Sequence, residues 1–134
     1  MKKIKKALIS ISDKKNLKKL LSTLSKYKVE IISSGGTFKQ IKKLKFKCLD
    51  ISSYTGSPEI LNGRVKTLHP KIHAGILSKR DNISHKKDLK DNNFNEIDLV
   101  IVNFYPFEKT LNSTNNHSKI IENIDIGGPA MVRA

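Results

Sequence analysis

Lys6-Ala-Leu-Ile-Ser-Ile11 is a short apolar run that predicts a buried β-strand, and the alternation that follows it decides the fold. Four leucines between residues 17 and 24 recur at intervals of three and four, which predicts a helix with one apolar face. Ser12-Asp13 is the expected N-cap of that helix. Val29–Ile32 predicts a second strand, and Lys47–Ile51 predicts a third, weaker one.

A second helix is predicted between the second and third strands. Thr37 and Gln40 have the spacing of a capping box at its start, and Phe38, Ile41 and Leu44 form its inner face. The first 50 residues therefore spell strand–helix–strand–helix–strand. This order predicts an α/β fold in three layers, a parallel sheet flanked by helices.

The rest of the chain is less regular. Ser52–Asp81 is predicted to be a long loop, because its apolar residues are scattered among glycines and prolines. Leu99–Phe104 is the clearest buried strand, and Ser84–Asn93 and Ser118–Ile124 are predicted helices. Pro129 suits the first turn of a last helix.

Length and composition limit the classes of function. With 134 residues and 15.1 kDa, residues 1–134 fit one domain, and no apolar run approaches the ~20 residues that span a bilayer. The single cysteine, Cys48, cannot form an internal disulfide, which favours a reduced, cytoplasmic setting. We expect Cys48 to be a small buried hydrophobe and not a nucleophile.

The net charge of +14 invites a nucleic-acid hypothesis, but only three of the 26 basic residues are arginines. Lysine lacks the planar fork that reads base edges, and aromatic residues are only 6% of the chain. We therefore expect no nucleic-acid partner. The expected alternative is a solvated lysine-rich surface that attracts small anions.

Two segments at predicted strand ends suggest an anion site. Ser34-Gly35-Gly36-Thr37 lies where a strand gives way to a helix, and glycines there let backbone N–H groups approach a phosphate. Ser12-Asp13-Lys14 follows the first strand, so it is expected at the same edge of the sheet. The alternative interpretation is that both segments are ordinary capped turns.

Three further segments carry polar groups. Asn62–Pro70 brings together an arginine, a lysine and a threonine, although it could be a basic surface loop. Asn103 and Tyr105 follow the clearest strand, with Phe104 and Phe107 expected in the core. Asp125 precedes a helix and could cap it or face a substrate amine.

A zinc site at His69 and His73 is not expected, because the motif glutamate and a clear third ligand are lacking and Pro70 disturbs the turn.

Together these segments are more specific than any one of them. The run Gly63-Arg-Val-Lys-Thr-Leu-His-Pro70, with Ser10–Lys14, Ser34–Thr37, His73–Leu77, Asn103–Phe107 and Asp125–Arg133 in the same order, resembles the amino-terminal region of the bifunctional purine biosynthesis protein family. The resemblance implies a methylglyoxal-synthase-like fold and a homodimer. It implies the IMP cyclohydrolase reaction, in which FAICAR closes to IMP with loss of water, without a metal or redox cofactor. The family's second domain, a transformylase that uses 10-formyltetrahydrofolate on AICAR, has no counterpart in these residues.

The resemblance also assigns roles to residues. Lys66, Tyr105 and Asp125 are expected to orient and polarise the formyl and amide groups. The residues expected to bind the nucleotide are Ser12, Asp13, Lys14, Ser34, Gly35, Gly36, Thr37, Arg64, Val65, Thr67, Asn103, Ile126 and Gly127.

One departure from the family bears on activity. The family's sequence continues past the Val132-Arg133-Ala134 segment to a lysine with a proton-transfer role, whereas this sequence ends at Ala134. We therefore expect an incomplete domain and weak or no cyclisation. Two other functions stay open: methylglyoxal synthase, and a regulatory nucleotide-binding domain like that of carbamoyl-phosphate synthetase. The Arg64–Pro70 run argues against the synthase.

Overall fold

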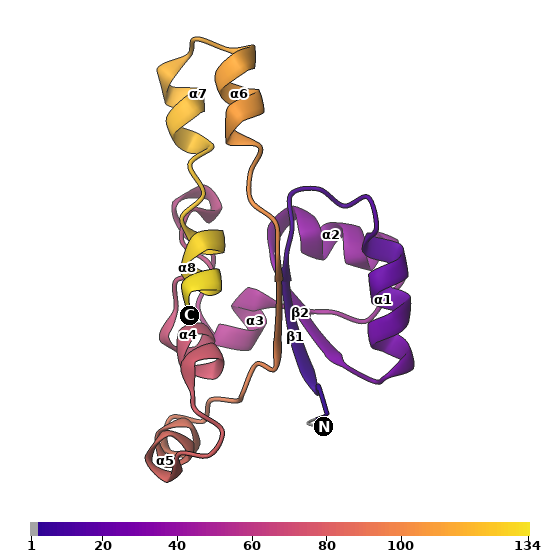
Figure 1. Cartoon of the computed structure of the whole chain (residues 1–134), viewed down its shortest axis with the longest axis vertical. Coiled ribbons are helices and arrows are strands. Elements are labelled where there is room, and N and C mark those ends of the chain that lie inside the picture. The colour runs from indigo at the N-terminus through magenta and orange to yellow at the C-terminus, as the bar shows by residue number, and fades with distance from the viewer. Residues whose placement is uncertain (1–2) are drawn as a thin grey trace.

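A four-stranded parallel sheet forms the centre of the fold in the computed structural model, which describes residues 3–134 (Figure 1). The strand order is β3-β2-β1-β4, and Ala7 of β1 is in register with Ile31 of β2 and Leu99 of β4. The elements are β1 (Lys6–Ser10), α1 (Leu17–Lys26), β2 (Glu30–Ser33), α2 (Gly35–Lys43), β3 (Leu49–Asp50), α3 (Ile51–Thr55), the 3₁₀ turn η1 (Leu61–Gly63), α4 (Pro70–Leu77), α5 (Ile83–Asp91), β4 (Leu99–Val102), α6 (Phe107–Ser113), α7 (His117–Glu122) and α8 (Gly127–Arg133).

The two faces of the sheet each have a core, because successive side chains of a strand point to opposite faces. Ala7 and Ile9 pack with the apolar residues of α1 and α2. Leu8, between them in sequence, packs on the other face with Ile72 of α4 and Met131 of α8. Figure 1 shows α1 and α2 on one side of the sheet and α3, α4 and α8 on the other. The predicted three-layer α/β fold is confirmed.

The caps predicted for α1 and α2 are wrong. The α1 helix begins at Leu17 with Asn16 as N-cap, because the Asp13 side chain instead accepts the backbone N–H of Lys15 and closes a separate turn. The α2 helix begins after Ser34, so Thr37 lies inside its first turn. The Thr37 hydroxyl donates to the carbonyl of Ile11, which follows β1, and not to its own helix.

The prediction of one long loop over 52–81 is also wrong. This stretch contains the rest of α3, then η1 and α4, which are too short for a helical period to show in the sequence. His69 caps α4 by accepting the Lys71 backbone N–H at 3.1 Å, and Pro70 occupies the first turn. The other ring nitrogen of His69 lies 3.2 Å from Ser57 Oγ, so both ring nitrogens have partners.

The strand predicted over Leu99–Phe104 ends at Val102, and its four residues are half-buried because β4 is an edge strand. Phe104 and Phe107, predicted to be core, are 50% and 37% exposed. The chain leaves the sheet here and forms two short helices, α6 and α7, that project from the body (Figure 1). The α6 helix was not predicted, whereas the helices expected near 84–93, 118–124 and after Asp125 are present as α5, α7 and α8.

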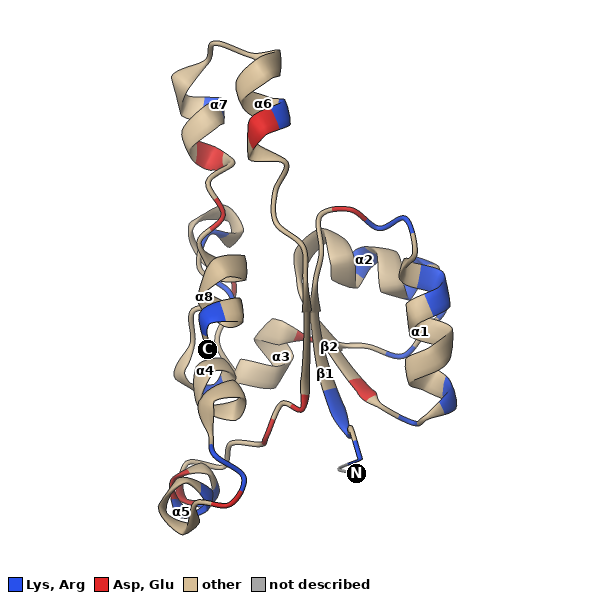
Figure 2. Cartoon of the chain, in the orientation of Figure 1, with Lys and Arg blue, Asp and Glu red and all other residues tan. Residues whose placement is uncertain are grey.

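No helix within residues 3–134 has both the length and the apolar character needed to cross a bilayer. Basic residues are distributed over α1, α2, α5 and the segment leading into β1, as Figure 2 shows.

Gly75 of α4 lies close to the backbone of residues 95–97, which lead into β4. The Ile97 backbone N–H donates to the Gly75 carbonyl at 2.9 Å, and Arg80 Nη2 donates to the carbonyls of Gly75 and Ile97. A Cβ added at Gly75 would lie 2.7 Å from the Asn95 carbonyl oxygen. This neighbour is backbone, so it cannot move aside as a flexible side chain would.

We expect Gly75→Ala to destabilise the fold by about 1–3 kcal/mol, because overpacking against backbone outweighs the gain in helix propensity. Urea unfolding measures this change. Ser84→Ala, on the exposed part of α5, is the control and should change stability by less than about 0.5 kcal/mol. Equal unfolding midpoints for the two variants would contradict the close approach.

Candidate functional site

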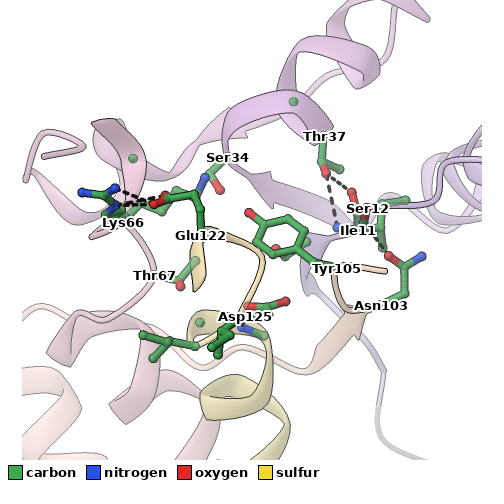
Figure 3. Close-up of a pocket in the computed structure, with 18 of the residues that line it drawn as sticks. Ile11, Ser12, Ser34, Thr37, Lys66, Thr67, Asn103, Tyr105, Glu122 and Asp125 are labelled. Carbon is green, nitrogen blue, oxygen red and sulfur yellow. Dashed lines mark hydrogen bonds and ion pairs between the residues drawn. The ribbon is translucent and has the colours of Figure 1, made fainter. Parts of the chain in front are cut away.

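A cavity of about 520 Å³ lies at the carboxyl ends of β1, β2 and β4 (Figure 3). Segments 62–67 and 121–128 complete its wall. The predicted site residues that line it are Ser12, Lys14, Ser34, Gly36, Thr37, Arg64, Lys66, Thr67, Asn103, Tyr105, Asp125, Ile126 and Gly127. The sequence-predicted residues thus come together from segments up to about 115 positions apart along the chain.

Three predicted residues lie outside the lining. Asp13 closes the turn before α1, and Val65 pairs with Ile60 in an isolated antiparallel bridge. Gly35 opens α2 beside the lining, and a Cβ there would lie 3.1 Å from Lys66 Nζ. For these three the structure indicates a role in shaping the loops around the cavity.

Two ammonium groups lie beside the first two residues of α2. Gly35 has a φ of +52°, and a Cβ there would lie 3.1 Å from Lys66 Nζ. A Cβ at Gly36 would lie 4.0 Å from Lys14 Nζ, which itself donates to the Ser12 carbonyl at 3.0 Å. The first backbone N–H groups of a helix lack intrahelical partners and carry partial positive charge. This corner of the cavity, the anion corner, is therefore positively charged, and its binding of an anion stays a prediction.

A left-handed turn presents Lys66 to that corner. Leu61, Asn62 and Gly63 all have positive φ, at 53°, 56° and 83°. Glycine adopts this conformation freely and asparagine tolerates it, whereas leucine is strained. A Cβ at Gly63 would lie 3.7 Å from Lys66 Nζ, so the turn and the ammonium pack closely.

Thr37 and Asn103 hold the loop that follows β1. The Thr37 hydroxyl donates to the Ile11 carbonyl at 2.8 Å and accepts the Ile11 N–H at 3.2 Å. The Asn103 side chain accepts the N–H groups of Ser12 and Asp13 and donates to the Asp13 carbonyl at 2.9 Å. Both polar side chains thus fix the wall of the cavity. Their contact with a ligand stays a prediction.

The start of α8 forms the opposite wall. Asp125 Oδ1 accepts the Gly128 N–H at 2.9 Å, so Asp125 bonds the first turn of this helix, whose N-cap position is Ile126. Cβ atoms at Gly127 and Gly128 would lie 2.5 Å from Thr67 Oγ1 and 2.6 Å from Asp125 Oδ2, so neither position accommodates a side chain. Figure 3 shows the Tyr105 ring between this wall and the Thr37–Asn103 side.

Sequence reasoning missed Glu122, the last residue of α7. Its carboxylate accepts the Arg64 guanidinium Nε–H at 2.9 Å, and Nη2 also donates to it. This hydrogen bond raises the pKa of Arg64 and lowers the pKa of Glu122. The partners are 58 positions apart and follow no motif, so no sequence signal identifies the pair.

Neither Cys48 nor the pair His69 and His73 lines the cavity. Burial, with a smaller contribution from Asp50, raises the pKa of the Cys48 thiol to about 11, so little thiolate forms at neutral pH. Within residues 3–134 no group of three or more His, Cys, Asp or Glu side chains is arranged to hold a metal ion.

Comparison with known proteins places these observations in a family. The family model described as MGS-like domain matches residues 16–130. Bifunctional purine biosynthesis protein PurH of Prochlorococcus marinus (strain MIT 9301) is 52% identical over 96% of this chain and 25% of the relative. PurH of Acetivibrio thermocellus is 52% identical over 98% of this chain and 26% of the relative. The chain therefore spans about a quarter of the length of these curated relatives.

Among solved structures, the crystal structure of ForH superposes with a TM-score of 0.81 at 29% identity. The match covers 97% of this chain and 66% of that one. The predicted resemblance to PurH and the predicted fold are both confirmed, and the chain belongs to the MGS-like domain family.

Proposed function

We propose that this chain binds a purine mononucleotide in the cavity and supplies this part of the site of an IMP cyclohydrolase, which closes FAICAR to IMP. The observation that carries the proposal is that the Lys66 and Lys14 ammonium groups lie beside Gly35 and Gly36 at the start of α2. A cavity of about 520 Å³ is in the size range of small-molecule sites. The printed name of the PurH relatives, a bifunctional purine biosynthesis protein, supports the substrate class.

The two ends of the cavity suit the two ends of a nucleotide. The phosphate would lie between the Lys14 and Lys66 ammonium groups, against the backbone N–H groups at the start of α2. The base would lie toward Asp125 and Tyr105. Asp125 uses Oδ1 for the Gly128 N–H, which leaves Oδ2 as an acceptor for an N–H donor of the ligand.

The proposed reaction is intramolecular. The carboxamide nitrogen attacks the formyl carbon and loses one proton, the formamido nitrogen loses the other, and the formyl oxygen leaves as water with these two protons. Holding the reactive rotamer supplies much of the rate enhancement of such a step, and proton transfer supplies the rest. Asp125 would orient the amide N–H, and the Tyr105 hydroxyl would donate to the formyl oxygen. The Lys66 ammonium, which lies beside Gly35, would bind the phosphate and help to orient the substrate.

Two alternatives keep the fold and change the ligand or the outcome. A regulatory domain would bind IMP without converting FAICAR. Methylglyoxal synthase would bind a phosphorylated triose in preference to a nucleotide. Competition between IMP and dihydroxyacetone phosphate separates the synthase from the other two. Transfer of a formyl group from 10-formyltetrahydrofolate to AICAR is proposed only for the longer relatives.

Replacing either ammonium should weaken nucleotide binding. We expect Lys66→Ala and Lys14→Ala each to lower the affinity for IMP about 10-fold to 100-fold, the range for a lost charge-assisted hydrogen bond. Titration calorimetry measures it. Lys39→Ala, on the exposed part of α2, is the matched control. Absence of IMP binding by the unchanged chain, or equal affinities for all three variants, would sink the proposal.

Gly35 offers a second test. Gly35→Ala should lower both stability and IMP affinity, because alanine is strained at φ +52° and its Cβ would press on the Lys66 ammonium. Gly56→Ala is the control, since Gly56 also has a positive φ, +78°, but has open space around it. That variant should lose stability alone. An unchanged IMP affinity in Gly35→Ala would show that the Lys66 position does not matter.

We also propose that two copies of the chain associate. Exposed apolar side chains run along the segment from β4 to the end of α8, including Leu111, Ile121, Ile124 and Val132. Sedimentation equilibrium should report about twice 15.1 kDa at high concentration. Leu111→Lys should shift the chain toward the monomer, and a monomer at all concentrations would exclude the homodimer.

A further inference from the structure

The α6–α7 hairpin, residues 107–122, has little to hold it in place. Neither helix has a buried residue, and helices of seven and six residues are marginal in isolation. Figure 1 shows the hairpin projecting from the body on two connecting segments, 103–106 and 123–126. Within residues 3–134, the hydrogen bonds of these two helices, apart from those of Glu122, stay within the hairpin and its connecting segments.

Glu122 is the exception, because its carboxylate reaches Arg64 on the far side of the cavity mouth. The guanidinium donates from Nε at 2.9 and 3.1 Å to the two carboxylate oxygens, and Nη2 donates as well. Arginine–carboxylate pairs of this bidentate kind fix geometry better than a lysine would. A single pair therefore joins the end of α7 to the loop that carries Lys66.

Both members of the pair line the cavity, so the pair belongs to its rim. Glu122 immediately precedes the connecting segment that contains Asp125. Fixing Glu122 thus restrains the carboxylate proposed to face the base. Arginine has five N–H donors, and the pair leaves the Nη1 donors unused by Glu122.

We propose that Glu122 is a positioning residue: its carboxylate holds the Arg64 guanidinium at the cavity mouth and docks the α6–α7 hairpin, which places Arg64 for an anionic ligand. This inference rests on the proposed nucleotide function and deepens it. It assigns Glu122 no contact with the reacting atoms.

The test combines affinity with hydrogen exchange on the full 134-residue chain. Glu122→Gln should lower the affinity for IMP about fivefold, the upper range for an exposed ion pair, and speed amide exchange in residues 117–123 without ligand. Glu108→Gln makes the same charge change on α6, outside the cavity lining, and should change neither readout. Unchanged affinity and exchange in Glu122→Gln would overturn the proposal.

A double-mutant cycle separates positioning from direct contact. In an Arg64→Ala background, Glu122→Gln should have no further effect on IMP affinity, because Glu122 acts through Arg64. The same fivefold loss in that background would overturn the proposal in favour of a direct contact between Glu122 and the ligand. If the unchanged chain binds no IMP, the proposed function fails, and the exchange comparison of Glu122→Gln with Glu108→Gln alone decides the docking role.

Discussion

The parallel pairing of β1 with β2 on one edge and β4 on the other is the constraint on which the site depends. Parallel strands in register end at the same edge of a sheet, so the segments that follow them must meet there. Ser12 and Lys14 after β1, Ser34 and Gly36 after β2, and Asn103 after β4 come together for this reason. The buried side chains of β1, alternating between the two cores, keep this register from slipping.

The strand ends are then tied to one another by side chains. Thr37, on the helix after β2, bonds both backbone groups of Ile11 after β1. Asn103, after β4, bonds the same loop two residues later. These two residues sit at the positions predicted to touch a ligand, and they also build the wall against which a ligand would lie. The Lys14 ammonium is held in turn by the carbonyl of that loop.

The sheet, α1 and α2 could be predicted because apolar periodicity reports burial directly, and buried strands and amphipathic helices differ in period. The short elements could not. The α3, η1 and α4 elements have too few turns to show a period, and α6 has no buried residue at all. Aromatic residues are usually buried, which predicts Phe104 and Phe107 in the core. They are exposed because the chain leaves the edge strand just before them.

The site was predictable where it follows from topology or from a compact motif. Lys14, Ser34 and Lys66 lie at strand ends or in the Gly63–Pro70 run, and they line the same cavity. Glu122 was not predictable, because its importance comes only from a partner 58 residues away. Asp13 and Thr37 show the limit of capping rules. Their side chains bond to backbone groups outside the helices that they are expected to cap.

The central claim is that the anion corner at the start of α2 receives the phosphate of a nucleotide. A crystal structure of this chain with IMP tests it most directly. The account predicts phosphate oxygens within hydrogen-bond distance of Lys14 Nζ, Lys66 Nζ and the backbone N–H groups of residues 35–37, with the base near Asp125. A phosphate bound elsewhere, or a nucleotide seated with its base at the start of α2, would contradict it.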